Sequence, residues 1–230
     1  MAHSGFRRPD APNTEAVEDY AKALHALAKR SDGAVSTSAL AERLGVSPGS
    51  VTAMLKRMQE LGLVEHERYR GALLTADGEQ VALEVIRHHR LLESYLTEVL
   101  GMPWDRVHNE AEVLEHYISE ELEERIAAAL GDPRHDPHGD PIPSRELALE
   151  SEPGVCLAEL EPGGGGTLAR VSDSDPEMLR FLAERGIRPG SRLTVAERAP
   201  FGGSVSIEVN GRPHAIGAEL ARRMVIAGAG

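Results

Sequence analysis

The sequence predicts a mostly α-helical protein that ends in a small β domain. Two observations favour this fold class: apolar residues recur every three to four positions in the first part of the chain, and after about residue 155 they gather in short runs. With 230 residues the chain is long enough for two or three small hydrophobic cores. We therefore expect three domains, at residues 14–75, 76–150 and 155–230.

The composition excludes several classes of protein. Hydrophobic residues make up 41% of the chain and charged residues 27%, as in globular proteins. No apolar run reaches the roughly 18 residues of a membrane span, and the polar N-terminus lacks a signal-peptide core, so we expect a cytoplasmic protein without a membrane partner. The single cysteine, Cys156, excludes an intramolecular disulfide framework. A net charge of -12 is unusual for a nucleic-acid-binding protein, so the local distribution of charge has to decide that question.

The first 75 residues follow the order of elements in a winged helix-turn-helix. The expected elements are helices at residues 14–30, 37–44 and 48–61, followed by short strands at 63–64 and 72–75. Ser36 or Thr37 is a suitable N-cap for the second helix, and Pro48 suits the first turn of the third. Three helices followed by a hairpin are the plan of a winged helix-turn-helix domain.

In this plan the helix at 48–61 is the recognition helix. Small hydroxyl-bearing residues in its first turn can approach phosphates and base edges, and basic residues further along can reach the DNA backbone. The predicted DNA contacts are Ser47, Pro48, Gly49, Ser50, Thr52, Lys56 and Arg57, with Arg68, Tyr69 and Arg70 at the hairpin tip. A winged helix that serves only protein contacts is an open alternative, because the fold is reused for many functions.

Two long helices are expected next, at residues 76–100 and 104–130, with breaks at Gly101 and Gly131. A pair of long helices beside a winged helix commonly forms a dimerisation layer. We therefore expect a homodimer, and double-stranded operator DNA with a palindromic sequence that matches the two-fold axis of the dimer.

The second of these helices carries the most informative pattern in the chain. His108, Glu112, Glu115 and His116 share one helical face, because residues three and four positions apart are neighbours on a helix. A second pair, His89 and Glu93, has the same four-residue spacing. Carboxylates and imidazoles without a thiolate suit Mn(II) or Fe(II). Metal-binding helices directly after a DNA-binding motif indicate a metal-sensing switch.

The rest of the chain is predicted to be a connection and a barrel. Residues 132–143 contain four prolines and are expected to form a solvated loop, in which His135, Asp136 and His138 are not expected to bind metal. The expected strands are 155–160, 167–171, 192–196, 205–209 and 224–227, with a helix at 176–185 capped by Asp175. The Asn210-Gly211 pair predicts a hairpin turn. These elements indicate a small SH3-like barrel.

Several motifs occur together along the chain. They are Ser-Pro-Gly-Ser-Val-Thr at 47–52, Arg-His-His-Arg-Leu-Leu-Glu at 87–93, Val-His-Asn-Glu-Ala-Glu-Val-Leu-Glu-His at 107–116, His-Gly-Asp-Pro-Ile-Pro at 138–143 and Arg-Pro-Gly-Ser at 188–191. With them, residues 14–227 resemble the diphtheria toxin repressor family of metal-dependent transcriptional regulators. The resemblance implies a repressor without enzymatic activity that binds operator DNA as a metal-loaded dimer and controls manganese or iron homeostasis genes. It also implies a C-terminal domain like FeoA.

The resemblance implies a primary metal site at Asp19, Glu112, Glu115 and His116. Iron-type members of the family have Met and Cys at the positions of Asp19 and Glu112, whereas manganese-type members have Asp and Glu. This chain has the manganese-type pair, and a site of oxygen ligands with one imidazole is a hard site. The resemblance therefore implies Mn(II), with Fe(II) as the alternative.

The resemblance also implies an ancillary metal site. It carries over to His89, Glu93 and His108, completed from the C-terminal domain by Asp175 and Glu177. Some two-domain manganese members bind two metals by means of a Glu three residues after the first-helix Asp. Lys22 stands at that position here, so the ancillary site is favoured over a binuclear one.

A metal that joins Asp19 of the DNA-binding domain to the dimerisation layer would hold two recognition helices at the spacing of successive major grooves. Two other functions stay open from the sequence. A metalloenzyme could use the Glu/His cluster to activate water, although no further nucleophile accompanies it. A winged-helix regulator could instead sense a small organic ligand.

Overall fold

The computed structural model describes residues 14–31, 33–67, 70–150 and 153–228, and in it the chain divides into two compact units. The first unit holds the described residues up to His89 together with Leu114–Glu124 and Pro143–Ala148. The second unit holds Arg90–Val113, Arg125–Ile142 and the described residues from Leu149 onward. Within the described ranges, no helix is both long enough and apolar enough to cross a membrane.

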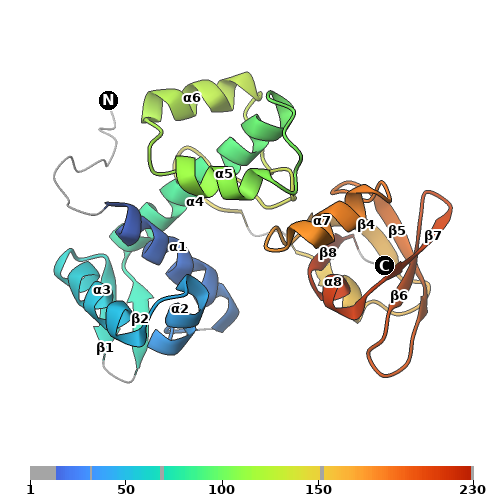
Figure 1. Cartoon of the computed structure of the whole chain (residues 1–230), viewed down its shortest axis with the longest axis horizontal. Coiled ribbons are helices and arrows are strands. Elements are labelled where there is room, and N and C mark those ends of the chain that lie inside the picture. Colours follow the sequence, from blue (N-terminus) through green and yellow to red (C-terminus); the bar gives the residue numbers. More distant parts are fainter. Residues whose placement is uncertain (1–13, 32, 68–69, 151–152, 229–230) are drawn as a thin grey trace. The chain divides into compact units, whose positions relative to one another are not determined.

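The first unit begins with the predicted winged helix-turn-helix (Figure 1). Its elements are α1 (Thr14–Ser31), α2 (Thr37–Leu44), α3 (Pro48–Glu60), β1 (Val64–Glu67) and β2 (Gly71–Leu74). The two strands pair antiparallel, and apolar side chains from all three helices and both strands form one buried core. The predicted order of elements is confirmed, and α1 belongs to the core of the DNA-binding domain.

Local capping explains where the helices of this domain begin. The Ser36 side chain accepts a hydrogen bond from the backbone N–H of Ala39 at the start of α2, and Ser47 does the same for Ser50 at the start of α3. These bonds satisfy N–H groups that the first turn of a helix leaves without a partner. Gly45, at φ +66°, ends α2 in the left-handed conformation and turns the chain toward α3.

The long helix α4 (Ala76–Glu98) follows the wing, as predicted. The predicted single helix over residues 104–130 is wrong. The structure has α5 (Val107–Leu114), a turn at residues 115–117 and α6 (Glu120–Ala129).

The break between α5 and α6 has a local cause. The Ser119 hydroxyl accepts a hydrogen bond from the backbone N–H of Leu122, so a new helix begins at this serine. His108 and Glu112 therefore share a face of α5, whereas Glu115 and His116 lie in the turn beyond it.

The connection at residues 132–143 is not the solvated loop that the prolines predicted. The His138 side chain is fully buried and Asp136 is also buried. The backbone carbonyl of His138 accepts a hydrogen bond from Val171 N, which fastens the connection to a strand of the β domain. Gly139, at φ +90°, lies so close to this strand that an added Cβ would come within 1.9 Å of the Ala169 carbonyl oxygen.

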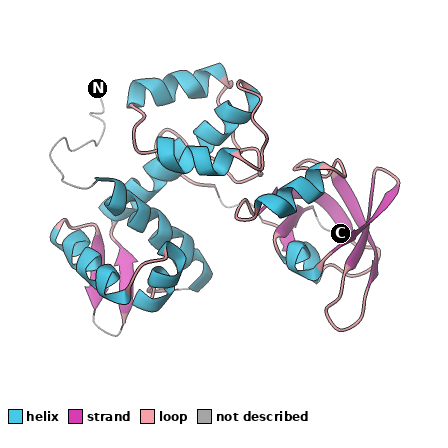
Figure 2. Cartoon of the chain, in the orientation of Figure 1, coloured by secondary structure: helices cyan, strands magenta, loops and turns pink. Residues whose placement is uncertain are grey.

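The second unit contains a six-stranded antiparallel sheet in the order β3-β8-β4-β5-β6-β7. Figure 2 draws the strands in magenta. The strands are β3 (Val155–Cys156), β4 (Gly165–Val171), β5 (Arg192–Arg198), β6 (Val205–Val209), β7 (Arg212–Ile216) and β8 (Met224–Ala227). The helices are α7 (Pro176–Ala183), α8 (Ala218–Arg222) and the single turn η1 (Leu157–Glu159). The SH3-like fold class agrees with this arrangement.

Two elements of this sheet domain escaped prediction. β7 contains Pro213 and polar neighbours, but it lies at the edge of the sheet, where a strand tolerates a proline. It pairs with β6 across the predicted Asn210-Gly211 turn. The helix α8 is only five residues long, too short for periodicity to show.

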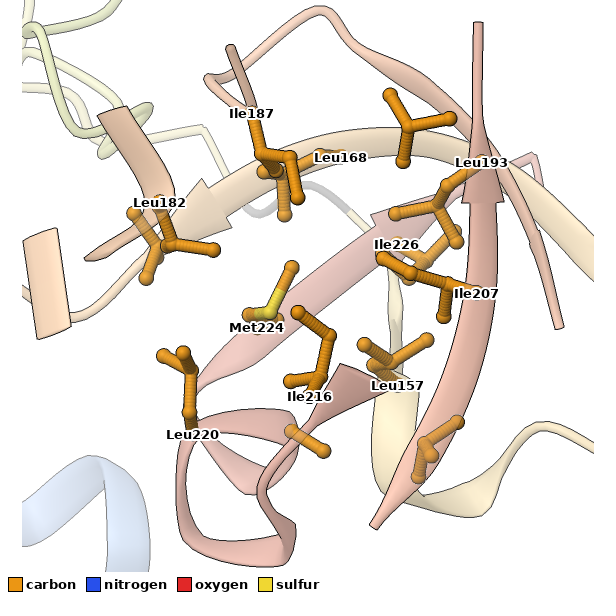
Figure 3. Packing of buried hydrophobic residues seen from close by; sticks show 14 of the residues in the cluster. Leu157, Leu168, Leu182, Ile187, Leu193, Ile207, Ile216, Leu220, Met224 and Ile226 are labelled. Carbon is orange, nitrogen blue, oxygen red and sulfur yellow. The ribbon is translucent and has the colours of Figure 1, made fainter. Parts of the chain in front are cut away.

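Buried aliphatic side chains fill the space between the sheet and its helices (Figure 3). Leu168, Leu193 and Ile207 come from the strands, and Leu182 comes from α7. Trp104, which precedes α5 in sequence, belongs to the same buried cluster and is 2% exposed. The helical segment before α5 therefore shares a core with the β domain, all within the second unit.

Candidate metal centre and DNA interface

One face of α1 meets the turn at residues 115–117 in the first unit. Glu15, Glu18, Asp19 and Lys22 lie at spacings of three and four residues, so they form one stripe on this helix. The hydroxyl of Tyr117 donates to Glu15, and the ring of His116 contacts both acidic residues in the middle of the stripe. Only Asp19 of this stripe was predicted as a site residue, although the spacing of the four residues is visible in the sequence.

The His116 imidazole lies between three carboxylates. Its Nδ1 is 2.6 Å from Glu18 Oε2, and its Nε2 is 3.2 Å from Asp19 Oδ1 and 3.7 Å from Glu115 Oε1. Burial lowers the pKa of His116, but the hydrogen bonds to Asp19 and Glu18 and the charge of Glu115 outweigh burial and raise the pKa to about 10. A metal ligand must be deprotonated, so a metal would displace the proton from this ring.

Glu115 is the fully buried carboxylate of this group, with no exposed side-chain area. Lys22 Nζ donates to both of its oxygens, at 2.7 Å and 2.9 Å, and His89 Nδ1 lies 2.5 Å from Oε2. A buried carboxylate is costly unless charged partners and hydrogen bonds surround it. Glu115 therefore has a positive partner on one side and the His116 ring on the other.

The donor set fits a hard divalent cation. Asp19, Glu115 and His116 each offer one ligand atom, and these atoms lie within 4.8 Å of one another. Two carboxylate oxygens and one imidazole nitrogen are the ligands that Mn(II) and Fe(II) accept, and no sulfur atom takes part. Of the four residues predicted for the primary site, these three come together in the first unit.

The fourth predicted ligand, Glu112, lies on α5 in the second unit. Its Oε1 is 3.8 Å from Nε2 of His108, one helical turn earlier. The prediction that His108 and Glu112 lie on the same face of a helix is therefore confirmed.

A second cluster surrounds the fully buried Glu93 on α4. His108 Nδ1 is 3.2 Å from Glu93 Oε1 and 3.2 Å from Asp173 Oδ2. His138 Nδ1 is 3.4 Å from Glu93 Oε2, while Nε2 of the same ring is 2.8 Å from the Trp104 carbonyl oxygen. Glu93, Asp136 and His138 also offer ligand atoms within 4.8 Å of one another.

The electrostatics of this second cluster favour bound positive charge. Burial raises the pKa of Asp136, and the neighbouring charges of Glu93 and Asp140 raise it further. Burial lowers the pKa of His138, but Glu93 and Asp136 outweigh it and raise the pKa to about 9. Buried carboxylates that repel one another in this way are stabilised by a proton or by a metal ion.

The structure brings different residues to this cluster from those that the sequence predicted. Glu93 and His108 are present as expected, and His89 lies one turn before Glu93 on α4. Asp173, rather than Asp175 or Glu177, is the carboxylate beside His108. Asp175 instead caps α7 by accepting hydrogen bonds from the backbone N–H groups of Glu177 and Met178. Asp136 and His138, which were expected to lie in a solvated loop and not to bind metal, belong to this buried cluster.

The predicted recognition helix presents its first turn outward. Ser47, Pro48, Gly49, Ser50, Thr52 and Lys56 are exposed, and Arg57 is half-buried. The hydroxyl of Thr52 donates to the Pro48 carbonyl, and Ser47 caps the helix. Arg70 is exposed in the turn directly before β2, whereas Arg68 and Tyr69 lie outside the described residues.

Family models match almost the whole length of the chain. The model described as "Iron dependent repressor, N-terminal DNA binding domain" matches residues 13–72. The model for the metal binding and dimerisation domain of iron dependent repressors matches residues 75–144, and the FeoA domain matches residues 155–227.

Named relatives and solved structures agree with these models. The chain is 37% identical to the iron-dependent repressor IdeR of Mycobacterium tuberculosis over 184 residues, which cover 75% of this chain and 79% of IdeR. It is 32% identical to the diphtheria toxin repressor of Corynebacterium glutamicum over 209 residues, covering 86% and 89%. A manganese-dependent transcriptional repressor in complex with manganese is 41% identical and superposes with a TM-score of 0.85, covering 91% of this chain and 98% of that chain. These relatives are repressors, which decides against a metalloenzyme.

Proposed function

Because this chain belongs to the diphtheria toxin repressor family of metal-dependent transcriptional repressors, we propose that it binds operator DNA as a homodimer when loaded with Mn(II). The choice of metal rests on one observation: the ligand atoms of Asp19, Glu115 and His116 lie close together, and none of them is a sulfur atom. We include Glu112 in the proposed primary site because manganese-type members of the family have Glu at this position. Such a regulator acts where the DNA is, in the cytoplasm.

Fe(II) is the second candidate metal. Curated relatives carry the name iron-dependent repressor, and Fe(II) accepts the same oxygen and imidazole ligands. Mn(II) is preferred in the proposal because the similar solved structure with 41% identity is a manganese-dependent repressor in complex with manganese. Comparing the two ions under anaerobic conditions distinguishes these candidates.

The site offers a route from metal to DNA within the first unit. A bound divalent ion supplies the positive charge that lets several carboxylates gather at one point. Asp19 lies on α1, whose Tyr20 and Ala21 share a buried core with Val51 and Leu55 of the recognition helix α3. Fixing Asp19 against the turn at residues 115–117 therefore fixes the orientation of α3 relative to that turn. In a dimer this sets the spacing of the two recognition helices.

Exposed apolar side chains support the proposed dimer. In the first unit Leu114, Tyr117 and Leu122 are exposed, and in the second unit Val99 and Val113 are more than half exposed. Large apolar groups on a surface mark interaction sites. A two-fold dimer would read a palindromic operator, so DNA selected by the protein should contain inverted repeats.

A second metal site is proposed around Glu93. His89, Glu93 and His108 are its predicted ligands, and Asp173 takes the place of Asp175 and Glu177. Asp136 and His138 add donors on the other side of Glu93. Because Asp173 precedes α7 in the β domain, a cation here would fasten the β domain to α4 and α5.

The proposal is tested with DNA selected from a random duplex pool in the presence of Mn(II). Fluorescence anisotropy of metal-stripped protein then gives the operator affinity with no metal, with Mn(II) and with Fe(II). We expect Mn(II) to tighten binding by roughly 5–150-fold, the usual range of coupling between two sites. Equal affinity with and without every metal would contradict the proposal. Failure to bind any divalent transition metal stoichiometrically would support the sensing of a small organic ligand instead.

A further inference from the structure

Two adjacent residues of α1 contact opposite nitrogens of one imidazole. Glu18 Oε2 lies 2.6 Å from Nδ1 of His116, and Asp19 Oδ1 lies 3.2 Å from Nε2. Neighbouring positions on a helix point about 100° apart, so they seldom meet the same side chain. Here each carboxylate contacts a different nitrogen of the ring.

The two carboxylates do not play equal parts. Asp19, Glu115 and His116 offer ligand atoms that all lie within 4.8 Å of one another, and Glu18 is not a member of that group. Nε2 of His116 is the nitrogen that faces both Asp19 and Glu115, while Nδ1 faces Glu18. Glu18 therefore lies behind the ring, on the side away from the candidate metal position.

A histidine that binds a metal through one nitrogen usually donates the N–H of its other nitrogen to a carboxylate or carbonyl. This second contact fixes the tautomer, holds the ring plane and makes the binding nitrogen more basic. The His116 side chain is 7% exposed and that of Glu18 is 24% exposed, so the contact is largely shielded from competing water.

We propose that Glu18 is the positioning residue of the metal centre: it accepts the Nδ1–H of His116 and thereby presents Nε2 to the metal. This inference rests on the proposed function, because it assumes that His116 is a metal ligand. It adds to the site a residue that is not itself a ligand.

The helix supplies a matched control one turn earlier. Glu15 accepts a hydrogen bond from the Tyr117 hydroxyl at 2.5 Å and so also helps to hold the turn at residues 115–117. Its carboxylate contacts the neighbour of His116, whereas the carboxylate of Glu18 contacts the ring itself. Removing Glu15 therefore weakens the attachment of the turn without changing the partner of Nδ1.

The test compares Glu18→Ala, Glu18→Gln and Glu15→Ala in the full-length protein. Nitrogen-15 NMR of metal-free protein reports whether the Nδ1–H proton of His116 is hydrogen-bonded and protected from exchange. Electron paramagnetic resonance of free Mn(II) gives the Mn(II) dissociation constant, and thermal unfolding checks that each variant is folded.

We expect Glu18→Ala to lose the protected Nδ1–H signal and to weaken Mn(II) binding by about 10–100-fold, the usual effect of removing such a partner. Glu18→Gln keeps an oxygen acceptor, so its loss should be clearly smaller. Glu15→Ala should retain both the signal and the affinity.

Wild-type affinity in Glu18→Ala would overturn the inference alone. Equal losses in Glu18→Ala and Glu15→Ala would also overturn it, because the effect would then come from attachment of the turn. A wild-type protein that binds no Mn(II) would overturn the proposed choice of metal, and the inference with it.

Discussion

Lys22 supplies the fixed positive charge of the candidate metal centre. Its ammonium donates to both oxygens of Glu115, whose side chain is fully buried. Removing one partner of a buried ion pair leaves an uncompensated charge, which typically costs about 3–5 kcal/mol. The metal-free protein thus depends on Lys22 to hold the buried Glu115 side chain in place.

Lys22→Met is therefore expected to lower the free energy of unfolding of the metal-free protein by about 3 kcal/mol. Mn(II) should then raise the melting temperature of the variant more than that of the wild type, because the ion restores the missing charge. Lys29→Met, at an exposed position of the same helix, serves as the control. Thermal unfolding with and without Mn(II) measures both effects, and an equal response in the two variants would contradict this role for Lys22.

His88 supports the ligand turn from the other side. It was not predicted as a site residue, but its Nδ1 lies 3.1 Å from the Glu115 carbonyl oxygen and its Nε2 lies 3.1 Å from Glu123 Oε2. Burial lowers the pKa of His88, but Glu123 and Glu84 outweigh burial and the pKa is raised. Burial raises the pKa of Glu123, but His88 and Arg87 outweigh it and that pKa is lowered.

These opposite shifts predict how the His88–Glu123 pair stabilises the protein as the pH changes. The contribution of His88 is complete below its ordinary pKa of 6.5 and disappears as the pH rises through its raised value. The contribution of Glu123 is complete above 4.5 and disappears as the pH falls through its lowered value. Urea unfolding from pH 5 to pH 9 should show a stability difference between wild type and His88→Gln that shrinks at alkaline pH. A constant difference would contradict the charged pair.

At the scale of elements, capping residues made much of the fold predictable. Ser36 and Asp175 cap helices as the sequence indicated, and α3 begins at Pro48 as predicted. The helix cap at Ser119 was not predicted, because the apolar periodicity continues from α5 into α6. Glu115 and His116 were therefore expected on a helix, whereas they lie in a turn. Their ligand geometry depends on contacts with α1, which lies about 95 residues earlier in the chain, and no local pattern shows such contacts.

The connection at residues 132–143 shows a different limit of sequence reasoning. Its prolines and charges are typical of a solvated loop, but burial of His138 against Trp104 and β4 overrides that composition. The ring of His138 stacks on the indole of Trp104, with ring centres 5.6 Å apart. The only tryptophan of the chain therefore reports on this attachment.

Gly139→Ala tests the attachment directly. The backbone at φ +90° and a Cβ 1.9 Å from the Ala169 carbonyl oxygen both oppose a side chain here. The control, Gly163→Ala, has φ +88° but no atom within 4 Å of the added Cβ. We expect Gly163→Ala to cost about 1–2 kcal/mol from backbone strain alone, with Gly139→Ala costing at least twice as much. Tryptophan fluorescence should change only in Gly139→Ala, and a similar cost in both variants would contradict the close packing.

For the whole molecule, the residue types of the site were more predictable than their partners. Asp19, Glu115 and His116 were identified with the help of the family resemblance, and the structure brings them together. Glu18 and Asp173 were not identified, and Asp136 was assigned to a solvated loop, because their contacts arise from segments that meet only in the folded chain. The net charge of -12 also has a structural counterpart, since carboxylates gather around Glu93 and along α1 while the recognition helix carries Lys56 and Arg57.

The central claim is that a metal held by α1 and the turn at residues 115–117 controls DNA binding. Linkage requires that operator DNA tighten Mn(II) binding by the same factor by which Mn(II) tightens operator binding. The most direct measurement is an electron paramagnetic resonance titration of Mn(II) with and without operator, in the wild type and in Asp19→Ala. We predict roughly 5–150-fold tighter Mn(II) binding with operator in the wild type and no such effect in Asp19→Ala. Mn(II) affinity that does not change with operator in the wild type would contradict the claim.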